Sequence, residues 1–361
     1  MGTRGTVLIA GAGGLVGRAT IDRYLGEGGW DVIALSRRLP EPATGAAHIA
    51  VDLADMASCR ARLGELRGVT HIVYAALFEK PDLTGGWLEA DQISTNLAML
   101  TNLMDAVEPG NPELRHVTLL QGAKAYGVHL GQIPVPARES APRHIHPNFY
   151  WAQEDFLAAR QAGKEWGWTI FRPQVVFGFA YPSMMNMVAA VGAYAAISRE
   201  LGLPLAYPGS GIRVTEATDA RLLARAIAWA GRTPSAFNQT FNVTNGDVFT
   251  WENLWPVIAR AFAMPVGLPH PMPLARIMPG HSGTWDKIVA RHGLRPLTLD
   301  GLVSGSWQFA DFAFSRTHST SSLLSTIKIR EAGFGDCIDT EASLAWWLAH
   351  MQEQKILPPA T

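Results

Sequence analysis

The chain has 361 residues, a formal net charge of −1, 48% hydrophobic residues and 17% charged residues. This length suits one large α/β unit or two lobes that share a cleft, and the apolar fraction supports a substantial core. A net charge this small gives no attraction to nucleic acid or to anionic membranes, so we expect neither as a partner.

Short apolar runs alternate with helical patterns along the first half of the chain. Strands are predicted at Thr6–Ala10, Asp31–Leu35, Ile49–Leu53, His71–Ala76, His116–Leu120 and Trp168–Phe171. Helices are predicted between them at Leu15–Tyr24, Asp91–Val107 and Tyr150–Trp166. This alternation is typical of parallel βαβ units, and near-continuous apolar strands indicate a sheet covered on both faces. The pattern predicts an α/β fold with a Rossmann-type, doubly wound parallel sheet.

The pattern changes after Pro173. An apolar helix rich in Met and Ala is predicted over Met184–Glu200, and a return to the sheet is predicted at Thr240–Val243. Pro and Trp become frequent later, as is usual for substrate loops and short helices. We therefore expect a smaller, discontinuous C-terminal substrate domain. The expected dinucleotide-binding domain spans 1–178 and about 212–248, and the substrate-binding part spans about 179–211 and 249–361.

Targeting segments and metal sites are not expected. The N-terminus lacks the long apolar region of a signal peptide, and the apolar stretch 187–197 is shorter than the roughly 20 residues of a membrane span. A cytoplasmic location follows by default. Cys59 and Cys337 are too far apart in sequence to indicate a disulfide framework. One Pro-rich loop contains His129, His144 and His146. The sequence gives them no further metal ligands at a typical spacing, so no metal is predicted there.

A glycine-rich turn follows the first strand directly. Residues 11–17 read Gly-Ala-Gly-Gly-Leu-Val-Gly, with Gly11, Gly14 and Gly17 at three-residue spacing. Such glycines permit a tight turn and close approach of a pyrophosphate, while the helix that opens at Leu15 and Val16 supplies free N–H groups. Because the turn lies between a strand and a helix, it predicts dinucleotide binding. The alternative is a glycine turn without a ligand.

The second strand ends in Ser36-Arg37-Arg38. Enzymes that prefer NAD usually carry an acid here, which accepts hydrogen bonds from the ribose hydroxyls. A basic pair suits a 2′-phosphate instead, so the predicted cofactor is NADPH/NADP+, and a solvated basic pair is the alternative. Asp52 and Leu53, at the predicted end of the third strand, are candidates for contact with the adenine.

The catalytic residues of the short-chain dehydrogenase/reductase superfamily are present only in part. Tyr150 opens the helix after the fifth strand, but Glu154 stands where a Tyr-x-x-x-Lys pair needs its lysine. Gly122 stands where a serine is expected, and Lys124 follows two residues later. An acid on the same helix face raises the pKa of a tyrosine, whereas Lys124 can supply positive charge. This favours stabilisation of a developing oxyanion over alcohol dehydrogenation.

Several further blocks resemble the progesterone 5β-reductase/iridoid synthase family of extended short-chain dehydrogenases/reductases. The blocks are residues 148–155, 122–127, 171–179, 183–186 with 194–197, and 241–251. The sequence departs from the family pattern at Trp151, where a second tyrosine is expected, and at Ala125, where a histidine is expected. Trp151 leaves Tyr150 as the functional tyrosine of the pair. The match fades towards the C-terminus.

The resemblance implies NADPH-dependent 1,4-reduction of the activated C=C bond of a small hydrophobic enone or enal. Tyr150 is expected to donate to the developing enolate oxygen, with Lys124 assisting. Further cofactor contacts are expected at Ala75, Gln121, Gly122, Pro173, Val176, Ser183 and Met185. The alternatives are another extended enzyme, such as a sugar-nucleotide epimerase or a hydroxysteroid dehydrogenase, and a non-catalytic NADP(H)-binding sensor. A homodimer is compatible with the sequence.

Two polar residues have a structural and a functional interpretation. Tyr126 could supply a second active-site hydroxyl, although a tyrosine in a Tyr-Gly turn is more often structural. Asn96, on the helix after the fourth strand, could be held in the active site by the backbone.

Overall fold

The computed structural model describes residues 4–211, 213–314 and 321–360. Residues 1–3, 212, 315–320 and 361 lie outside the described part, and with them the expected domain limits at 1, 212 and 361. The division into domains therefore stays a prediction, and the elements are described individually below.

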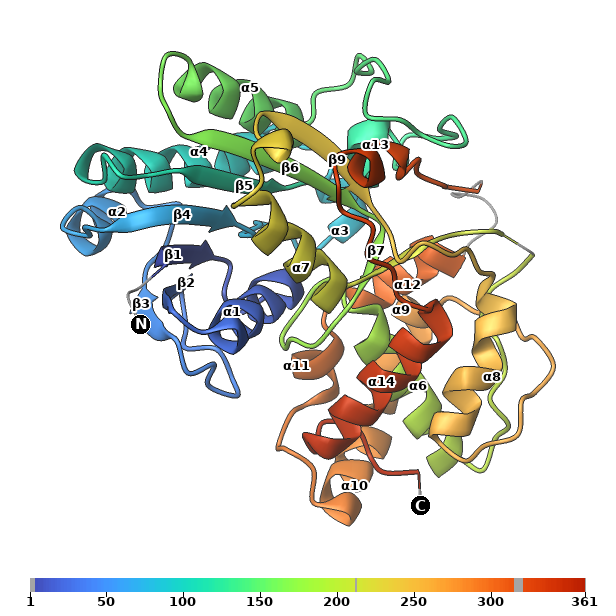
Figure 1. Cartoon of the computed structure of the whole chain (residues 1–361). Coiled ribbons are helices and arrows are strands. Elements are labelled where there is room, and N and C mark those ends of the chain that lie inside the picture. Colours follow the sequence, from blue (N-terminus) through green and yellow to red (C-terminus); the bar gives the residue numbers. More distant parts are fainter. Residues whose placement is uncertain (1–3, 212, 315–320, 361) are drawn as a thin grey trace.

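A seven-stranded parallel sheet forms one lobe of the molecule (Figure 1). Its order is β3-β2-β1-β4-β5-β6-β9. The strands are β1 (Gly5–Ala10), β2 (Trp30–Ser36), β3 (Ala47–Ala50), β4 (Val69–Tyr74), β5 (His116–Leu120), β6 (Gly167–Pro173) and β9 (Gln239–Val243). The order reverses between β1 and β4, and ligands of open α/β sheets bind at the carboxyl ends of the strands beside such a switch point.

Helices cover both faces of this sheet. On one face α1 (Leu15–Glu27) packs against α7 (Ala220–Ala230), and the other face carries α2 (Met56–Leu63), α4 (Ala90–Val107) and α5 (Phe149–Gln161). The side chains of β1 alternate between the two cores: Val7 and Ile9 pack in one, Leu8 and Ala10 in the other. The predicted Rossmann-type sheet with two covered faces is confirmed.

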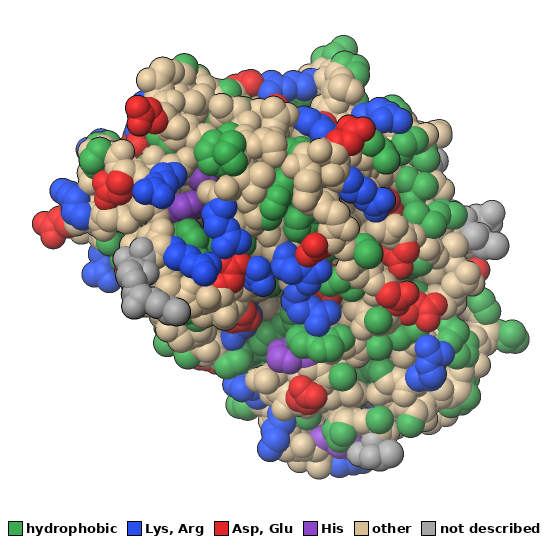
Figure 2. Space-filling view, viewed as in Figure 1, with side chains coloured by type: hydrophobic (Ala, Val, Ile, Leu, Met, Phe, Trp, Pro, Cys, Tyr) green, Lys and Arg blue, Asp and Glu red, His purple; other side chains and the backbone are tan. Residues whose placement is uncertain are grey.

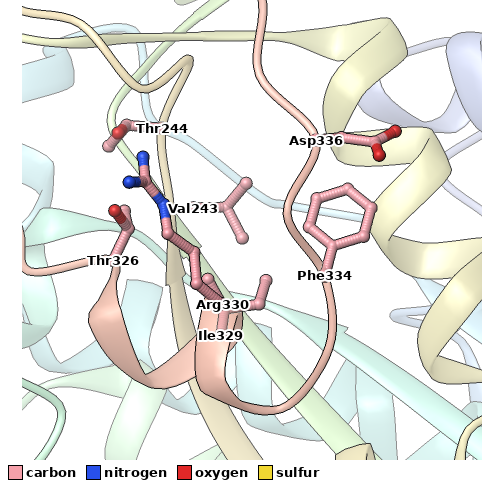
Figure 3. Close-up of a pocket in the computed structure, with 7 residues that line it drawn as sticks. All are labelled: Val243, Thr244, Thr326, Ile329, Arg330, Phe334 and Asp336. Carbon is pink, nitrogen blue, oxygen red and sulfur yellow. The ribbon is translucent and has the colours of Figure 1, made fainter.

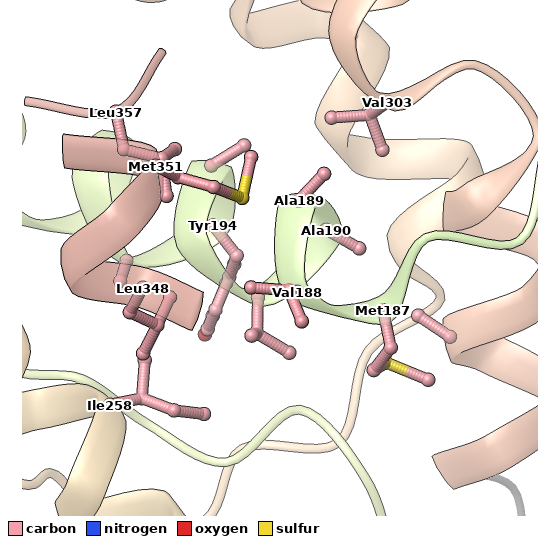
Figure 4. Packing of buried hydrophobic residues seen from close by; sticks show 14 of the residues in the cluster. Met187, Val188, Ala189, Ala190, Tyr194, Ile258, Val303, Leu348, Met351 and Leu357 are labelled. Carbon is pink, nitrogen blue, oxygen red and sulfur yellow. The ribbon is translucent and has the colours of Figure 1, made fainter. Parts of the chain in front are cut away.

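The other lobe is built around α6 (Met187–Glu200), which is buried for most of its length. Small apolar side chains such as Ala189 and Ala190 let its neighbours approach closely, and Tyr194 fills the space beside them (Figure 4). The surrounding elements are α8 (Trp251–Ala261), α9 (Leu274–Ile277), α10 (Ser282–His292), α11 (Leu299–Val303), α12 (Ser306–Phe314) and α14 (Thr340–Glu353). Among the described residues, no helix combines the length and apolarity needed to cross a membrane.

Several short elements lie between the longer ones. A two-stranded parallel sheet joins β7 (Val175–Phe177) to β8 (Ala217–Asp219), and the short helices are α3 (Leu83–Gly86) and α13 (Ile327–Glu331). Single 3-10 turns are η1 (Glu108–Gly110), η2 (Ala123–Tyr126), η3 (Pro234–Ala236) and η4 (Met278–His281). A shallow pocket lies in the seam between β9 and α13, with Arg330 and Phe334 on its wall (Figure 3). This seam is at the sheet edge opposite β3, four strands away from β1.

Basic and acidic side chains are interspersed on the face that Figure 2 shows. Several arginines of the described chain are paired with acidic side chains. Arg23 and Arg232 both contact Glu27, at 2.6 and 2.7 Å, and Arg225 contacts Asp336 at 2.7 Å. The exposed Arg225–Asp336 pair contributes little to stability.

Some predicted element ends differ from the structure. The third strand is Ala47–Ala50 rather than Ile49–Leu53, because Ser36 at the end of β2 pairs with Ala50. Asp52 and Leu53 therefore lie beyond the strand. The helix predicted to reach Trp166 ends at Gln161, and Gly163 follows in the left-handed region at φ +76°.

Two further predicted ends are shifted in the structure, one by a helix cap and one by strand pairing. The helix predicted from Met184 begins at Met187, because the side chain of Asn186 caps it by accepting from the Ala189 N–H at 3.1 Å. The sixth strand continues through Arg172 and Pro173, which pair with Asn242 and Val243 of β9.

A buried carboxylate connects β8 to a segment far along the chain. Glu216 is 6% exposed, and its Oε2 accepts a hydrogen bond from the Leu324 N–H at 2.7 Å. Burial raises the pKa of Glu216 to about 7, and the hydrogen bonds to Leu324 and Thr244 only partly oppose this. The folded state therefore holds a proton on Glu216 that the unfolded chain releases near pH 4.5.

Glu216→Gln tests this linkage. The contribution of Glu216 to stability is fully present below pH 4.5 and is lost as the pH rises through about 7. The amide keeps an acceptor for Leu324 and never ionises, so we expect a melting temperature about 2 °C above wild type at pH 8. The two proteins should converge near pH 5 in thermal unfolding. An equal difference at both pH values would contradict the assignment.

Candidate active site

The glycine-rich turn lies between β1 and α1, at the switch point of the sheet. Gly11 has φ +85°, and a Cβ there would stand 2.5 Å from the carbonyl group of Ala75. A Cβ on Gly17 would stand 2.2 Å from the Gly11 carbonyl oxygen. Only glycine permits these two approaches, one between β1 and the residue that follows β4 and one between the turn and α1.

The first turn of α1 has free N–H groups. Its N-cap is Gly14, which has no side chain to accept from them, and the helix itself leaves the N–H groups of Leu15, Val16 and Gly17 unused. A Cβ on Gly13 would meet nothing within 4 Å, so the turn is open. Open space, free N–H groups and the positive end of a helix fit the pyrophosphate of a dinucleotide.

The segment after β2 presents two basic side chains. Arg37 and Arg38 are exposed, whereas Ser36 is half-buried and its Oγ lies 2.9 Å from His48 Nε2 on β3. The same hydroxyl donates to the Arg38 carbonyl oxygen at 2.5 Å, which holds the turn together. Arg18 of α1 donates to the carbonyl of Glu41 at 3.1 Å and fixes the segment that follows. The exposed guanidinium groups can therefore meet a phosphate.

Asp52 and Leu53 lie between β3 and α2. Asp52 is exposed, and its Oδ1 accepts from the Ala54 N–H at 3.0 Å. Leu53 is buried, and its carbonyl accepts from Asn102 at 2.8 Å. The second carboxylate oxygen of Asp52 is free to accept from a ligand, whereas the side chain of Leu53 is buried and only its backbone can contact one.

Asn148 holds the two catalytic candidates together. It caps α5, with Oδ1 accepting from the Tyr150 N–H at 3.0 Å, while its amide donates to the Lys124 carbonyl at 2.9 Å. Tyr150 therefore begins α5 directly beside η2, which carries Lys124. The structure brings together the two residues that the sequence places 26 positions apart.

The hydroxyl of Tyr150 faces the position of the missing serine. A Cβ on Gly122 would stand 3.5 Å from Tyr150 Oη and 3.5 Å from the Pro173 carbonyl oxygen. Burial raises the pKa of Tyr150, the charge of Glu79 adds to this, and Arg172 opposes both. Tyr150 is therefore a protonated O–H donor at neutral pH.

Lys124 is buried beside a carboxylate that sequence reasoning missed. Its Nζ lies 3.3 Å from Glu79 Oε1 and 4.2 Å from the ring centroid of Trp87. Burial lowers the pKa of Lys124, and the charge and hydrogen bond of Glu79 oppose this. One signal could have indicated Glu79: it stands soon after the fourth strand, at the edge where ligands bind.

Glu154 does not act on Tyr150 as the sequence predicted. Its carboxylate turns away from the hydroxyl and binds Arg172 at 3.1 Å, Gln121 at 3.2 Å and Arg143 at 3.4 Å. Glu154 and Tyr150 do lie on the same face of α5, as the sequence predicted, but the Glu154 carboxylate forms an ion pair with the buried Arg172 of β6. The acid that raises the pKa of Tyr150 is Glu79.

The other predicted cofactor contacts are distributed around this edge of the sheet. The Gln121 side chain spans α5 and β6, donating to the Tyr150 carbonyl at 3.0 Å and accepting from Arg172 at 2.8 Å. Val176 is half-buried in β7. The Ser183 carbonyl accepts from Ser306 at 2.8 Å, and Met185 precedes α6 with a half-buried side chain.

The two weaker candidates have defined partners. Tyr126 donates to Asn242 Oδ1 at 2.5 Å. This contact favours the structural role of Tyr126 over a role as a second active-site hydroxyl. Asn96 is fully buried and binds the Phe78 N–H and carbonyl, both at 2.9 Å. Asn96 therefore holds the backbone beside Glu79 rather than presenting its own amide.

The three loop histidines gather next to this site. The ring centroids of His129, His144 and His146 are 6.0 to 6.4 Å apart. Burial, followed by the charge of Lys124, lowers the pKa of His129 to about 3, so this ring is neutral at pH 7. Within the described ranges, no group of His, Cys, Asp and Glu side chains has the arrangement of a metal site.

Comparison with known proteins identifies the family. The model of the PRISE-like Rossmann-fold domain matches residues 50–358. The chain belongs to the PRISE-like family. It is 33% identical to an (S)-8-oxocitronellyl enol synthase of Nepeta cataria, over 98% of this chain and 92% of that protein. It is 32% identical to a 3-oxo-Δ4,5-steroid 5β-reductase of Arabidopsis thaliana, over 97% and 92% of the two chains.

Solved structures resemble this PRISE-like chain in fold. A putative epimerase from Burkholderia cenocepacia superposes with a TM-score of 0.68 at 18% identity, over 97% of this chain and 99% of the other. The UDP-glucose 4-epimerase of Thermus thermophilus, solved with NAD, gives 0.66 at 19% identity, over 96% and 99% of the chains. At such identities the likeness shows the fold alone.

Gly17→Ala tests the packing of the turn in this PRISE-like chain. Because the new Cβ meets backbone at 2.2 Å, we expect a stability loss of about 3 kcal/mol in urea unfolding, at the upper end of overpacking costs. Gly26→Ala is the matched control on the same helix. Nothing lies within 4 Å of that Cβ, so it should stabilise by about 0.5 kcal/mol. Equal effects of the two variants would contradict the geometry.

Proposed function

We propose that this PRISE-like chain is an NADPH-dependent oxidoreductase that reduces the activated C=C bond of hydrophobic enones or enals. The observation that carries the proposal is the pairing of Tyr150, a buried and protonated donor, with the Lys124 ammonium. The serine and lysine of alcohol dehydrogenation are replaced by Gly122 and Glu154. The named activities of the two plant relatives, an enol synthase and a steroid 5β-reductase, support reduction of a C=C bond.

The chain's residues stabilise the charge that the reaction develops. When bound, NADPH would supply a hydride to the β-carbon of the substrate. Negative charge then moves to the carbonyl oxygen, where Tyr150 donates a hydrogen bond and Lys124 contributes positive charge. The α-carbon takes a proton from solvent, which completes the addition of H2 across the C=C bond. Burial of both side chains excludes water and strengthens each interaction.

NADPH fits the residues at the sheet edge. The open turn at Gly11, Gly14 and Gly17 would hold the pyrophosphate, and the exposed Arg37 and Arg38 would hold the 2′-phosphate. A charge-assisted contact contributes about 1.5–3 kcal/mol, roughly a ten- to hundredfold preference.

The function is tested by mixing purified protein with NADPH and 2-cyclohexen-1-one and identifying the product. We expect NADPH consumption and the saturated ketone. The allylic alcohol would instead indicate carbonyl reduction and contradict the roles of Gly122 and Lys124. Binding of NADPH without turnover on a panel of enones and enals would favour a sensor, and conversion of a UDP-sugar would favour an epimerase.

Arg37→Ala/Arg38→Ala tests the cofactor. The loss of both guanidinium groups should weaken NADPH binding about 10- to 100-fold while leaving NADH binding nearly unchanged. Dissociation constants for both cofactors, measured by quenching of tryptophan fluorescence, check this. Equal weakening of NADPH and NADH binding would show that the two arginines do not bind the 2′-phosphate.

Tyr150→Phe tests the donor. Loss of one hydrogen bond to a developing oxyanion typically lowers kcat about 10²- to 10³-fold, while the Kd for NADPH should stay the same. Tyr74→Phe is the matched control. Tyr74 is buried on β4, and its hydroxyl finds no partner among the described residues, so this variant should keep full turnover. Near-full turnover of Tyr150→Phe would refute the assigned role.

A further inference from the structure

Three donors converge on one buried carboxylate beside the proposed catalytic pair. The Glu79 side chain is 4% exposed. It accepts from Gln92 Nε2 at 2.6 Å, from Trp87 Nε1 at 3.3 Å and from Lys124 Nζ at 3.3 Å. A carboxylate is seldom buried so completely without partners, and here every donor comes from a different element or loop.

The backbone on both sides of Glu79 is held from α4. Asn96 binds both the N–H and the carbonyl of Phe78 at 2.9 Å, and Gln92 Oε1 accepts from the Lys80 N–H at 3.3 Å. Gln92 and Asn96 are themselves fully buried. Two side chains one helical turn apart thus fix the direction in which Glu79 points, as expected of a built site rather than a chance contact.

Lys124 needs this carboxylate to stay charged. Burial lowers the pKa of its ammonium, and Glu79 supplies both interactions that oppose the shift. Among the residues that the structure describes, Glu79 is the one acceptor for Lys124 Nζ. A lysine buried without a counter-charge loses its proton at a lower pH, because a low-dielectric surrounding disfavours the charged form.

We propose that Glu79 is a positioning residue that keeps the Lys124 ammonium charged and aims it at the substrate oxygen beside Tyr150. This inference rests on the proposed function. An ammonium has three N–H donors, of which one meets Glu79. The Trp87 ring, 4.2 Å from Nζ, supports a second side of the ammonium by a cation–π contact. Nζ also lies 5.7 Å from the Phe149 ring centroid and 5.8 Å from the Tyr150 ring centroid, so the ammonium and the phenol are neighbours.

The same carboxylate acts on Tyr150. Its negative charge raises the pKa of the phenol, so the hydroxyl keeps the proton that it must donate. Two histidines of the neighbouring loop also lie close to Lys124. Burial lowers the pKa of both His129 and His144, which leaves them uncharged. Because the pKa of Tyr150 is raised above its ordinary value of 10, alkaline loss of activity between pH 6 and 10 should report on the Lys124–Glu79 pair.

The test compares the pH profiles of wild type and Glu79→Gln, with kcat measured on 2-cyclohexen-1-one between pH 6 and 10. Glutamine keeps the shape and an acceptor but removes the charge. We expect the alkaline limb of kcat to move to lower pH by about one pH unit or more, so that kcat falls most at the alkaline end of the range while the Kd for NADPH stays unchanged. Glu79→Asp keeps the negative charge, so its alkaline limb of kcat should lie between those of Glu79→Gln and wild type. If kcat of Glu79→Gln fell by the same factor at every pH, with the alkaline limb in its wild-type position, the proposal would be overturned and Glu79 would have a structural role.

Glu89→Gln is the matched control. Glu89 lies in the same segment but is half exposed and pairs with Lys80, so its replacement should leave the profile unchanged. A readout without turnover separates this inference from the proposed function. Competitive acetylation of Lys124, followed by mass spectrometry over pH, reports its protonation directly. Faster acetylation at pH 8 in Glu79→Gln supports the pair even if wild type reduces no enone, and equal rates would overturn it.

Discussion

Burial of an ammonium group beside Tyr150, the proposed hydrogen-bond donor, is the constraint on which the site depends. Lys124 is withdrawn from water, which lowers the pKa of its ammonium, and the nearby Glu79 carboxylate opposes this shift. Glu79 in turn depends on Trp87 and Gln92, and the backbone beside it depends on Asn96. The whole arrangement costs desolvation free energy that a hydrophobic core would not, which is a reason to attribute it to function rather than to stability.

The sheet supplies the location. Parallel strands place their carboxyl ends along one edge, so the glycine turn after β1, the basic pair after β2, Glu79 after β4 and Lys124 after β5 come from one side of the fold (Figure 1). Glu154 and Arg172 form a second ion pair behind this edge, at 3.1 Å, which ties α5 to β6. One acid of the site thus holds the framework, while we propose that the other keeps the Lys124 ammonium charged.

The sequence predicted the elements well where local pattern decides them. The predicted strand His116–Leu120 and the predicted end of α4 at Val107 agree with the structure. The spacing of apolar residues and the turn residues that follow indicate both. It predicted β3 poorly, since its pairing with β2 sets that strand's register. Glu79 was missed and Glu154 was misassigned for the same physical reason. Contacts between residues 45 or 18 positions apart leave no local signal, as the Lys124–Glu79 and Arg172–Glu154 bonds show.

The position of transferred hydrogen in the product tests the central claim most directly. Wild-type protein is supplied with NADPH that carries deuterium at the transferable position and with 2-cyclohexen-1-one, and the product is examined by NMR. The account predicts one deuterium on the β-carbon of cyclohexanone and solvent-derived hydrogen on the α-carbon. Deuterium on the carbinol carbon of an allylic alcohol would contradict it, because the site would then reduce a carbonyl rather than stabilise an enolate.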